Sequence, residues 1–389
     1  MAKPMQLEDL FPHMVDLRRT IHRHPELAFE EVETAKTIMA ELDDIGVPYN
    51  YGGEGSAVIG RLDVDDDLPT VGLRAEMDAL PGDENTGLNF SSKVDGKMHA
   101  CGHDAHMAMV LGAARQLERE PADGNVVFVF QPAEERGGGA RVVVDSGAVD
   151  DLQAIFAGHV SRKYRVGEIM VGDGIITAQS DQFLITIHGR GGHGARPHEA
   201  IDAVVIAGSM INTVQTIVSR ELDPVHPSVI TIGRVEAGVA PNVIAERAVL
   251  EGSIRTTHPD IRQHIHEGLK RMASAFAELH SAKIKVDIRS GYPPVVNTQR
   301  ESDIARTAAG NVVGEECVRH MEHPSMGSED FAYFLQEIPG AYVRFGARPS
   351  GAEHIPLHSS SFTVDEEVLK VGAAFYDEVA RQALIELDR

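Results

Sequence analysis

The chain of 389 residues is long enough for two domains, and its formal net charge of -23 is strongly acidic. Its 42% hydrophobic and 24% charged residues are ordinary for a globular protein with a sizeable core. A surface this acidic repels phosphate backbones and anionic lipids, which argues against nucleic-acid and membrane partners. A small anionic substrate is still compatible, because positive charge inside a cleft can outweigh the global field.

The cysteine content and the apolar runs indicate a compartment. Only two cysteines, Cys101 and Cys317, are present, which excludes a disulfide scaffold and suits a reducing environment. The first residues lack the apolar core of a signal peptide, and no uncharged run approaches the roughly 20 apolar residues that span a bilayer. We therefore expect a soluble, cytoplasmic protein.

The outer parts of the chain alternate between short apolar runs and helical patterns. Two helical patterns flank the turn around Pro25, and a further helical pattern lies at 105–117. The apolar runs are 57–62, 71–75, 126–130 and 155–157. The run at 126–130 is continuous rather than alternating, as in a strand that is covered on both faces. This alternation predicts an α/β domain with a mixed, mostly parallel sheet.

Residues 181–292 follow a different order of predicted elements. The expected strands are 182–189, 228–238, 245–256 and 282–291, and the expected helices are 200–222 and 259–280. The resulting order, βαββαβ, is that of the ferredoxin-like arrangement. We therefore predict a small domain at 181–292, inserted into a larger domain made of 1–180 and 293–389.

The densest cluster of reactive side chains is MHACGHDAHM at 98–107. Cys101 and His103 stand just before the helical pattern, with Asp104 as a candidate cap. Thiolate and imidazole are preferred ligands of zinc-like metals, and a loop that enters a helix holds both rigidly. A lone Cys-x-His would more often be a buried cysteine beside surface histidines. Three histidines, one cysteine and one aspartate within eight residues favour a metal site.

A pair of carboxylates, Glu134 and Glu135, directly follows the run at 126–130. Ligands of open α/β sheets gather at the carboxyl ends of strands. Adjacent carboxylates on a loop point in different directions, so one can bind a metal while the other takes a proton from water. A solvated acidic turn is the ordinary alternative for such a pair.

Further candidates lie at the ends of other predicted strands. His159 follows the run at 155–157, where a lone histidine is more often a satisfied core residue. Glu76 and Asp78 leave the strand at 71–75, and acidic residues there can orient a ligating imidazole. His358, in IPLH, carries no information by itself.

The sequence also permits two other functional interpretations, a thiol hydrolase and a dinucleotide-binding protein. Cys101 could be a nucleophile with a histidine base, but a thiol enzyme does not need the recurring carboxylates and histidines. Gly189, Gly191 and Gly194 match GxGxxG after a predicted strand. A dinucleotide site also needs an acidic residue about 20 positions on, at the end of a second parallel strand, where this chain is still in an apolar helix.

Eight segments between residues 20 and 370 match the motifs of a known family, in the same order. They are IHRHPELAFEE, RAEMDALP, KMHACGHDAH, QPAEE, GGHGARPHEAID, APNVIA, MGSEDFAYF and LHSSSF. Together they resemble the aminoacylase-like metallopeptidases, in the branch of hippurate hydrolases and indoleacetyl-amino-acid amidohydrolases. The resemblance implies hydrolysis of N-acyl-amino acids, with acetyl, benzoyl or similar acyl groups, to a carboxylic acid and a free amino acid. It also implies two divalent metal ions (Zn, Mn, Co or Ni), a lid domain at 181–292, and a homodimer or higher homo-oligomer formed through the lid.

The resemblance also implies a role for each residue that matches a family motif. The metal ligands would be Cys101, His103, Glu135, His159 and His358. Glu134 would be the general base, with Asp78 as its catalytic support. On the lid, His193 would stabilise the oxyanion, reaching across a dimer, while Asn242 and Arg255 would hold the substrate carboxylate.

The sequence departs from the family pattern at two positions. Glu76 stands where the family usually has aspartate, and Ala245 stands where proline usually follows Asn-Val-Ile. Both departures leave the metal set intact and leave substrate preference open. A non-catalytic binding protein on the same scaffold is the remaining alternative, and the presence of Glu134 speaks against it.

Overall fold

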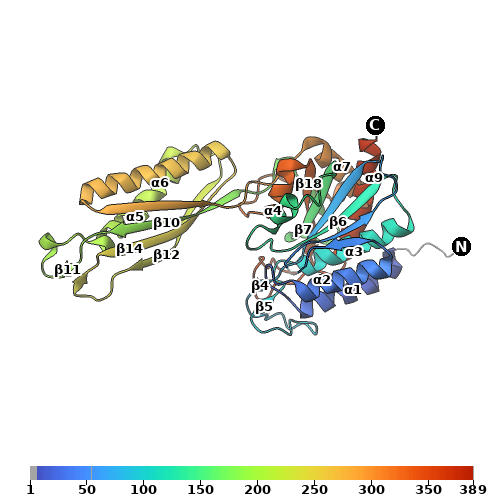
Figure 1. Cartoon of the computed structure of the whole chain (residues 1–389), viewed down its shortest axis with the longest axis horizontal. Coiled ribbons are helices and arrows are strands. Elements are labelled where there is room, and N and C mark those ends of the chain that lie inside the picture. Colours follow the sequence, from blue (N-terminus) through green and yellow to red (C-terminus); the bar gives the residue numbers. More distant parts are fainter. Residues whose placement is uncertain (1–6, 54, 389) are drawn as a thin grey trace. The chain divides into compact units, whose positions relative to one another are not determined.

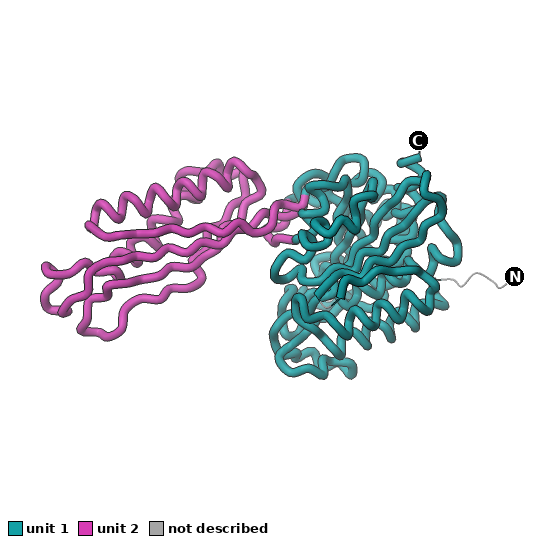
Figure 2. Tube along the Cα trace, in the orientation of Figure 1, with its two compact units in different colours: residues 1–176, 296–323, 330–389 teal, residues 177–295, 324–329 magenta. Residues whose placement is uncertain are grey.

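The computed structural model describes residues 7–53 and 55–388, which form two compact units (Figures 1 and 2). Unit 1 comprises residues 1–176, 296–323 and 330–389, and unit 2 comprises 177–295 and 324–329. The chain therefore passes into unit 2 twice, and the second visit is the short segment Pro324–Glu329. Each unit has its own cluster of buried apolar side chains.

Unit 1 is built on an eight-stranded mixed sheet. In spatial order its strands are β1 (Tyr49–Tyr51), β2 (Val58–Leu62), β6 (Asn125–Gln131), β3 (Thr70–Glu76), β7 (Ala154–Arg165), β18 (Gly340–Arg348), β8 (Ile169–Val171) and β17 (Val318–His320). The four strands β6, β3, β7 and β18 run parallel to one another, so their carboxyl ends share one edge. All residues of β6 and β3 are buried, as the continuous apolar run predicts.

The helices of unit 1 enclose this sheet. They are α1 (Leu7–Arg23), α2 (Val32–Ile45), α3 (His103–Arg119), α4 (Gly139–Asp145), α7 (Gln299–Val313), α8 (Phe334–Glu337) and α9 (Val368–Leu387). Helices α3 and α9 pack against each other and against β3. Four short strands complete the unit: β4 (Leu80–Pro81) pairs with β5 (Lys97–Met98), and β9 (Gly174–Ile175) pairs with β16 (Val296–Asn297).

Helix α3 begins differently from the sequence-based expectation. Gly102 occupies the N-cap position without a side-chain bond, so the expected cap at Asp104 is wrong. The buried carboxylate of Asp104 instead accepts hydrogen bonds from Nε of Arg18 (2.9 Å) and Nδ1 of His22 (2.8 Å). Because both donors lie on α1, this buried pairing ties α1 to the start of α3, next to His103.

Unit 2 has the predicted ferredoxin-like order. Its elements are β10 (Gln179–His188), β11 (Gly192–His193), α5 (Ala203–Thr216), β12 (Ser228–Ala237), β13 (Val243–Ile244), β14 (Arg247–Thr256), α6 (Pro259–His280) and β15 (Lys283–Ser290). The antiparallel sheet has the order β12-β14-β10-β15. Alternate residues of β10, among them Phe183 and Ile185, face the two helices, as expected of a sheet with one covered face.

Helix α5 is shorter than the expected helix at 200–222. The side chain of Asp202 caps it by accepting the N–H groups of Val204 and Val205, and a π-helical turn at Ile217–Glu221 replaces its last turn. Over the described residues, no helix combines the length and the apolar character that crossing a membrane would require.

Candidate metal centre

The candidate metal centre lies at the carboxyl edge of the parallel strands of unit 1. Asp78 follows β3, Glu134 and Glu135 follow β6, and His159 lies within β7. A second group comes from the loop before α3, which carries Cys101. Strand ends that are adjacent in the sheet thus converge with a helix start, as the position of ligands in open α/β sheets predicts.

The five predicted ligands come together in two adjacent groups. The Sγ atom of Cys101 lies 3.1 Å from Nε2 of His159, and Nε2 of His358 lies 3.2 Å from Oε1 of Glu135. The candidate ligand atoms of Cys101, His103 and His159 all lie within 4.8 Å of one another, and so do those of Cys101, Glu135 and His358. Cys101 belongs to both groups, so the set fits two neighbouring cations with one shared ligand.

The imidazole tautomers fit this assignment. Nδ1 of His103 lies 2.8 Å from the backbone oxygen of Asp78, and Nδ1 of His159 lies 2.7 Å from the backbone oxygen of Val160. A carbonyl oxygen only accepts, so Nδ1 donates in both rings and Nε2 is the nitrogen left for a cation. Nε2 of His103 is fully buried and has no hydrogen-bond partner among the described residues. A buried ring nitrogen of this kind is compatible with a ligand to a metal ion.

Glu134 lies inside the same cluster. Its carboxylate is 6% exposed and lies within 4.8 Å of the ligand atoms of His103 and Glu135. Asp78 organises these neighbours, because its Oδ2 accepts the backbone N–H of Glu135 (2.9 Å) while its backbone oxygen holds His103. Asp78 therefore positions one ligand from each of two loops.

Backbone strain is concentrated around this centre. Among the described residues, four that are not glycine have a positive φ, and three of these lie beside the cluster: Phe29 (64°), Ala133 (55°) and His358 (64°). The strain at Ala133 is held by Glu31, whose Oε1 accepts the Ala133 N–H at 2.8 Å. Such outliers persist only where the surrounding structure over-determines them, and they are common at functional sites.

A buried network below the centre was not anticipated from sequence. Arg74 donates to Gln131 (2.8 Å), to Asp330 (2.8 Å) and to Glu76. Glu76 in turn accepts from Nδ1 of His106 at 2.8 Å.

His106 connects this network, through its second ring nitrogen, to the strand that carries His159. Its Nε2 accepts the backbone N–H of Val160 (3.0 Å), the residue after His159. His106 thereby links β3 to the strand that carries a ligand. His106 belongs to the histidine-rich motif, which gives it a signal in the sequence, whereas Arg74 opens the segment RAEMDALP without a role that the segment indicates.

Electrostatics argue against a thiol nucleophile. Burial raises the pKa of the Cys101 thiol well above its usual range, and the carboxylates of Glu135 and Glu134 raise it further. Catalytic thiols need the opposite, a lowered pKa in an electropositive setting. Burial lowers the pKa of His103, but Asp78 and Glu76 more than compensate and raise it to about 10. This cluster of carboxylates attracts positive charge.

The three remaining predicted residues belong to unit 2. His193 and Asn242 are neighbours, since β11 pairs His193 with Val243 and the Gly194 N–H donates to the Asn242 oxygen at 2.9 Å. Arg255 lies near the end of β14, where its Nη1 donates to the oxygen of Met326 (3.0 Å).

The register of the sheet separates these residues within unit 2. His193 follows the end of β10 at which His188 pairs with Arg247, the first residue of β14. Arg255 comes eight residues after Arg247 along β14, a distance of roughly 26 Å at the rise of a β-strand. One copy of unit 2 therefore presents His193 and Arg255 at opposite ends of its sheet.

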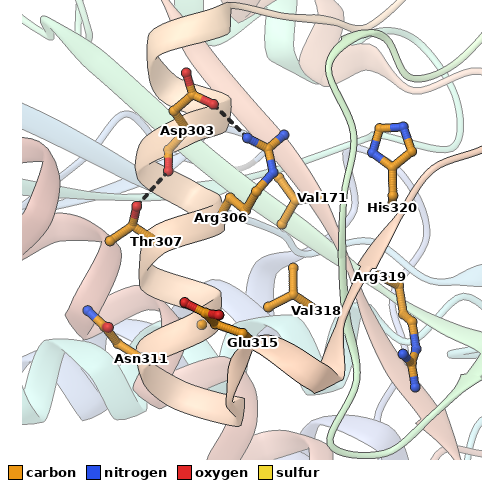
Figure 3. A pocket seen from close by; sticks show the side chains of 10 residues that line it. Val171, Asp303, Arg306, Thr307, Asn311, Glu315, Val318, Arg319 and His320 are labelled. Carbon is orange, nitrogen blue, oxygen red and sulfur yellow. Dashed lines mark hydrogen bonds and ion pairs between the residues drawn. The ribbon is translucent and has the colours of Figure 1, made fainter.

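A separate hollow of about 640 Å³ lies elsewhere on unit 1, between α7 and β17 (Figure 3). Asp303 and Arg306 on α7 form an ion pair in it, and Arg319 and His320 come from β17. None of the predicted site residues lines this hollow, so we do not assign the reaction to it in spite of its size.

Comparison with known proteins decides the family. The model of "Peptidase family M20/M25/M40" matches residues 72–382. This chain belongs to that family. An IAA-amino acid hydrolase of Arabidopsis thaliana (ILR1-like 4) is 38% identical over 386 residues, which cover 97% of this chain and 87% of that protein. The N-acetylcysteine deacetylase of Bacillus subtilis is 38% identical over 374 residues, which cover 94% and 96% of the two chains.

A solved structure agrees with this membership. The crystal structure of a dinuclear metal binding peptidase from M20 family of Bacillus subtilis has a TM-score of 0.84 and 35% identity. It covers 98% of this chain and 99% of that chain. The resemblance drawn from the motifs and the predicted fold class are thereby confirmed, and the M20 family member described here is a metal-dependent hydrolase of amide bonds.

Metal removal and substitution of each cysteine test the proposed ligands. We expect chelation to abolish hydrolysis without unfolding the protein, and divalent cations to restore it, because the apolar clusters that stabilise the two units contain none of the predicted ligands. Cys101→Ser should weaken metal affinity by at least about 100-fold, since it removes the shared ligand. Cys317→Ser, at the other free cysteine, is the matched control and should bind metal normally. Metal content per chain and turnover are the measurements; full activity after chelation would contradict the assignment.

Proposed function

We propose that this enzyme hydrolyses the amide bond of N-acyl-amino acids, releasing a carboxylic acid and a free amino acid. One observation carries the proposal: five predicted ligands and the carboxylate of Glu134 converge in one largely buried cluster. The relatives named above act on compounds of this class, an IAA-amino acid and N-acetylcysteine. The bound cations would be two of Zn, Mn, Co or Ni, because thiolate and imidazole suit zinc while the carboxylate also tolerates manganese or cobalt.

The protein's own side chains account for the proton transfers. Two divalent ions in this site would lower the pKa of a water toward about 7 and polarise the amide carbonyl. Glu134 takes the proton from the attacking water and later returns it to the leaving nitrogen. Asp78 keeps His103 and Glu135 in place during both transfers, because it bonds to the ring of one and the backbone of the other.

Glu134→Gln tests the base directly. Glutamine keeps the size of the side chain but cannot accept the proton, so we expect kcat to fall by about 10²–10⁴-fold. Metal content measured on the same preparation should stay at the wild-type level, since Glu134 is not among the proposed ligands. A variant with near-normal kcat would show that another group is the base.

Arg255 is proposed to bind the carboxylate of the amino-acid half, together with Asn242 of the partner subunit of a homodimer, because Asn242 lies at the His193 end of the sheet. A guanidinium can hold a carboxylate through two parallel hydrogen bonds, which suits recognition of a free amino acid. Within the described residues, Nη1 of Arg255 donates to the oxygen of Met326 and to Oγ of Ser328. The rest of the guanidinium fork is therefore suited to a ligand.

Arg255→Ala should raise KM for N-acyl-amino acids by about 10- to 100-fold, since a hydrogen-bonded charge pair is lost. The matched amide substrates, in which the free carboxylate is replaced by a carboxamide, should be affected much less. Arg289→Ala, at an exposed position of the same sheet, is the control and should leave both KM values unchanged. Equal losses for acid and carboxamide would contradict a carboxylate clamp.

His193 is proposed to stabilise the oxyanion in the partner subunit of a homodimer. The separation of roughly 26 Å between the His193 end and Arg255 supports this, because one copy of unit 2 cannot bring both to one small substrate. The edge strand β12 supports association through unit 2: it is an unpaired edge that exposes Val229 and Val235. Val204 and Val205 of α5 are exposed as well. Exposed strand edges with apolar side chains commonly pair with a second copy.

Hybrid dimers test the arrangement. His193→Ala and Glu134→Gln should each be nearly inactive alone. A hybrid isolated with two different tags contains one site with an intact Glu134 and a His193 from the other subunit. Such a hybrid should recover about half of the wild-type activity per dimer. An inactive hybrid, with the dimer intact by light scattering, would show that His193 acts within its own subunit.

The cytoplasmic location stays a proposal. It rests on the two cysteines, both of which are free, since structural disulfides belong to oxidising compartments.

A further inference from the structure

An apolar pocket of about 430 Å³ lies beside the metal centre in unit 1. Three segments line it: the turn at 27–30, residues 79–81 after Asp78, and residues 135–137. Glu135 is the shared boundary, because it lines the pocket and also lies within 4.8 Å of the candidate ligand atoms of Cys101 and His358. A group in this pocket would be one side chain away from the reacting centre.

Backbone contacts and a hydrogen bond hold the turn at 27–30 against the loop that carries Asp78 and the loop that carries Glu134. The Ala79 N–H donates to the oxygen of Glu26 (2.7 Å), and Leu27 forms a β-bridge with Ala79. On the other side of the turn, Glu31 holds the Ala133 N–H, next to Glu134. The pocket wall is thus fixed relative to the loops that carry Asp78 and Glu134.

Phe29 is the unusual member of this wall. The turn is closed by a hydrogen bond from the Glu30 N–H to the Leu27 oxygen (2.8 Å), and Phe29 has a φ of 64°, a region that favours glycine. Its side chain is still 41% exposed. Gly137 makes room for the ring, because a Cβ there would lie 2.5 Å from it. An aromatic ring held half-exposed on a strained backbone points to a ligand that covers it.

We propose that this pocket receives the acyl group of the substrate and selects apolar acyl groups larger than acetyl; this rests on the proposed function. Six of the lining residues are apolar: Leu27, Ala28, Phe29, Ala79, Leu80 and Pro81. The charge of Glu30 is countered by Lys97 at 3.1 Å. A cavity of about 150 Å³ already binds benzene, so this one has room for a benzoyl or arylacetyl group or a comparable alkyl chain.

The test is a series of acyl groups on one amino acid, from acetyl to butanoyl, hexanoyl and benzoyl, assayed with the metal-loaded enzyme. In the wild type, each added CH₂ that enters the pocket should raise kcat/KM by about fourfold. Ala28→Phe fills the pocket and should lower kcat/KM for the benzoyl substrate by at least about tenfold while changing that for the acetyl substrate by less than about twofold. Phe29→Ala should also lower the benzoyl value selectively. Val318→Phe, in the separate hollow of Figure 3, is the matched control and should change neither.

Each outcome bears on a different claim. Selective loss of large acyl substrates in either pocket variant supports the assignment. Equal changes for acetyl and benzoyl substrates, or a wild type without preference over acetyl, would overturn the acyl pocket while leaving the amidohydrolase proposal standing. No cleavage of any N-acyl-amino acid by folded, metal-loaded protein would overturn both.

Discussion

Pairing of buried negative charge is the constraint on which the catalytic unit depends. Taking a carboxylate out of water is costly unless cations or hydrogen-bond donors compensate it. Among the buried carboxylates around the centre, those of Glu76, Asp104 and Asp330 belong to completely buried residues. Each is paired, the first and last with Arg74 and Asp104 with Arg18. Burial raises the pKa of Glu76, but Arg74 and His106 hold it well below its usual range, so the carboxylate stays charged.

These pairings also position the ligands. Arg74 of β3 donates a hydrogen bond to Gln131 of β6. This bond holds together the two strands that lead to Asp78 and Glu134. Arg18 restrains the start of α3 through Asp104, which adjoins His103, a predicted ligand. Preorganised ligands cost little to arrange when a cation binds. Burial raises the pKa of the Cys101 thiol, and the negative charges of Glu135 and Glu134 raise it further, so these carboxylates do not activate the thiol.

Strain at the rim of the centre has a consistent physical explanation. Ala133 and His358 hold a left-handed backbone because Glu31 binds the N–H of the first and the Ala100 oxygen accepts the N–H of the second (2.9 Å). Phe29 is held in the same way by its turn and by contact with Gly137. The stability of the buried sheet compensates the cost of these strained residues, and the strained backbone fixes the direction of a few side chains.

The sequence by itself determined which residues are chemically able to act and on which kind of element they lie. The motif at 98–107, the pair Glu134 and Glu135 after an apolar strand, and the βαββαβ order could all be predicted, because they depend on local spacing and on patterns of burial. The resemblance to a family added His159 and His358, whose local sequence carries little information.

Only the tertiary structure decided what these residues contact. Arg74, Glu31 and Phe29 act through partners far away in the chain, and no local pattern encodes such contacts. The expected cap at Asp104 failed for that reason, since Arg18 and His22 of another helix compete for its carboxylate. The separation of His193 from Arg255 likewise follows from strand register, which is set by pairing between strands and not by the spacing of residues along one of them.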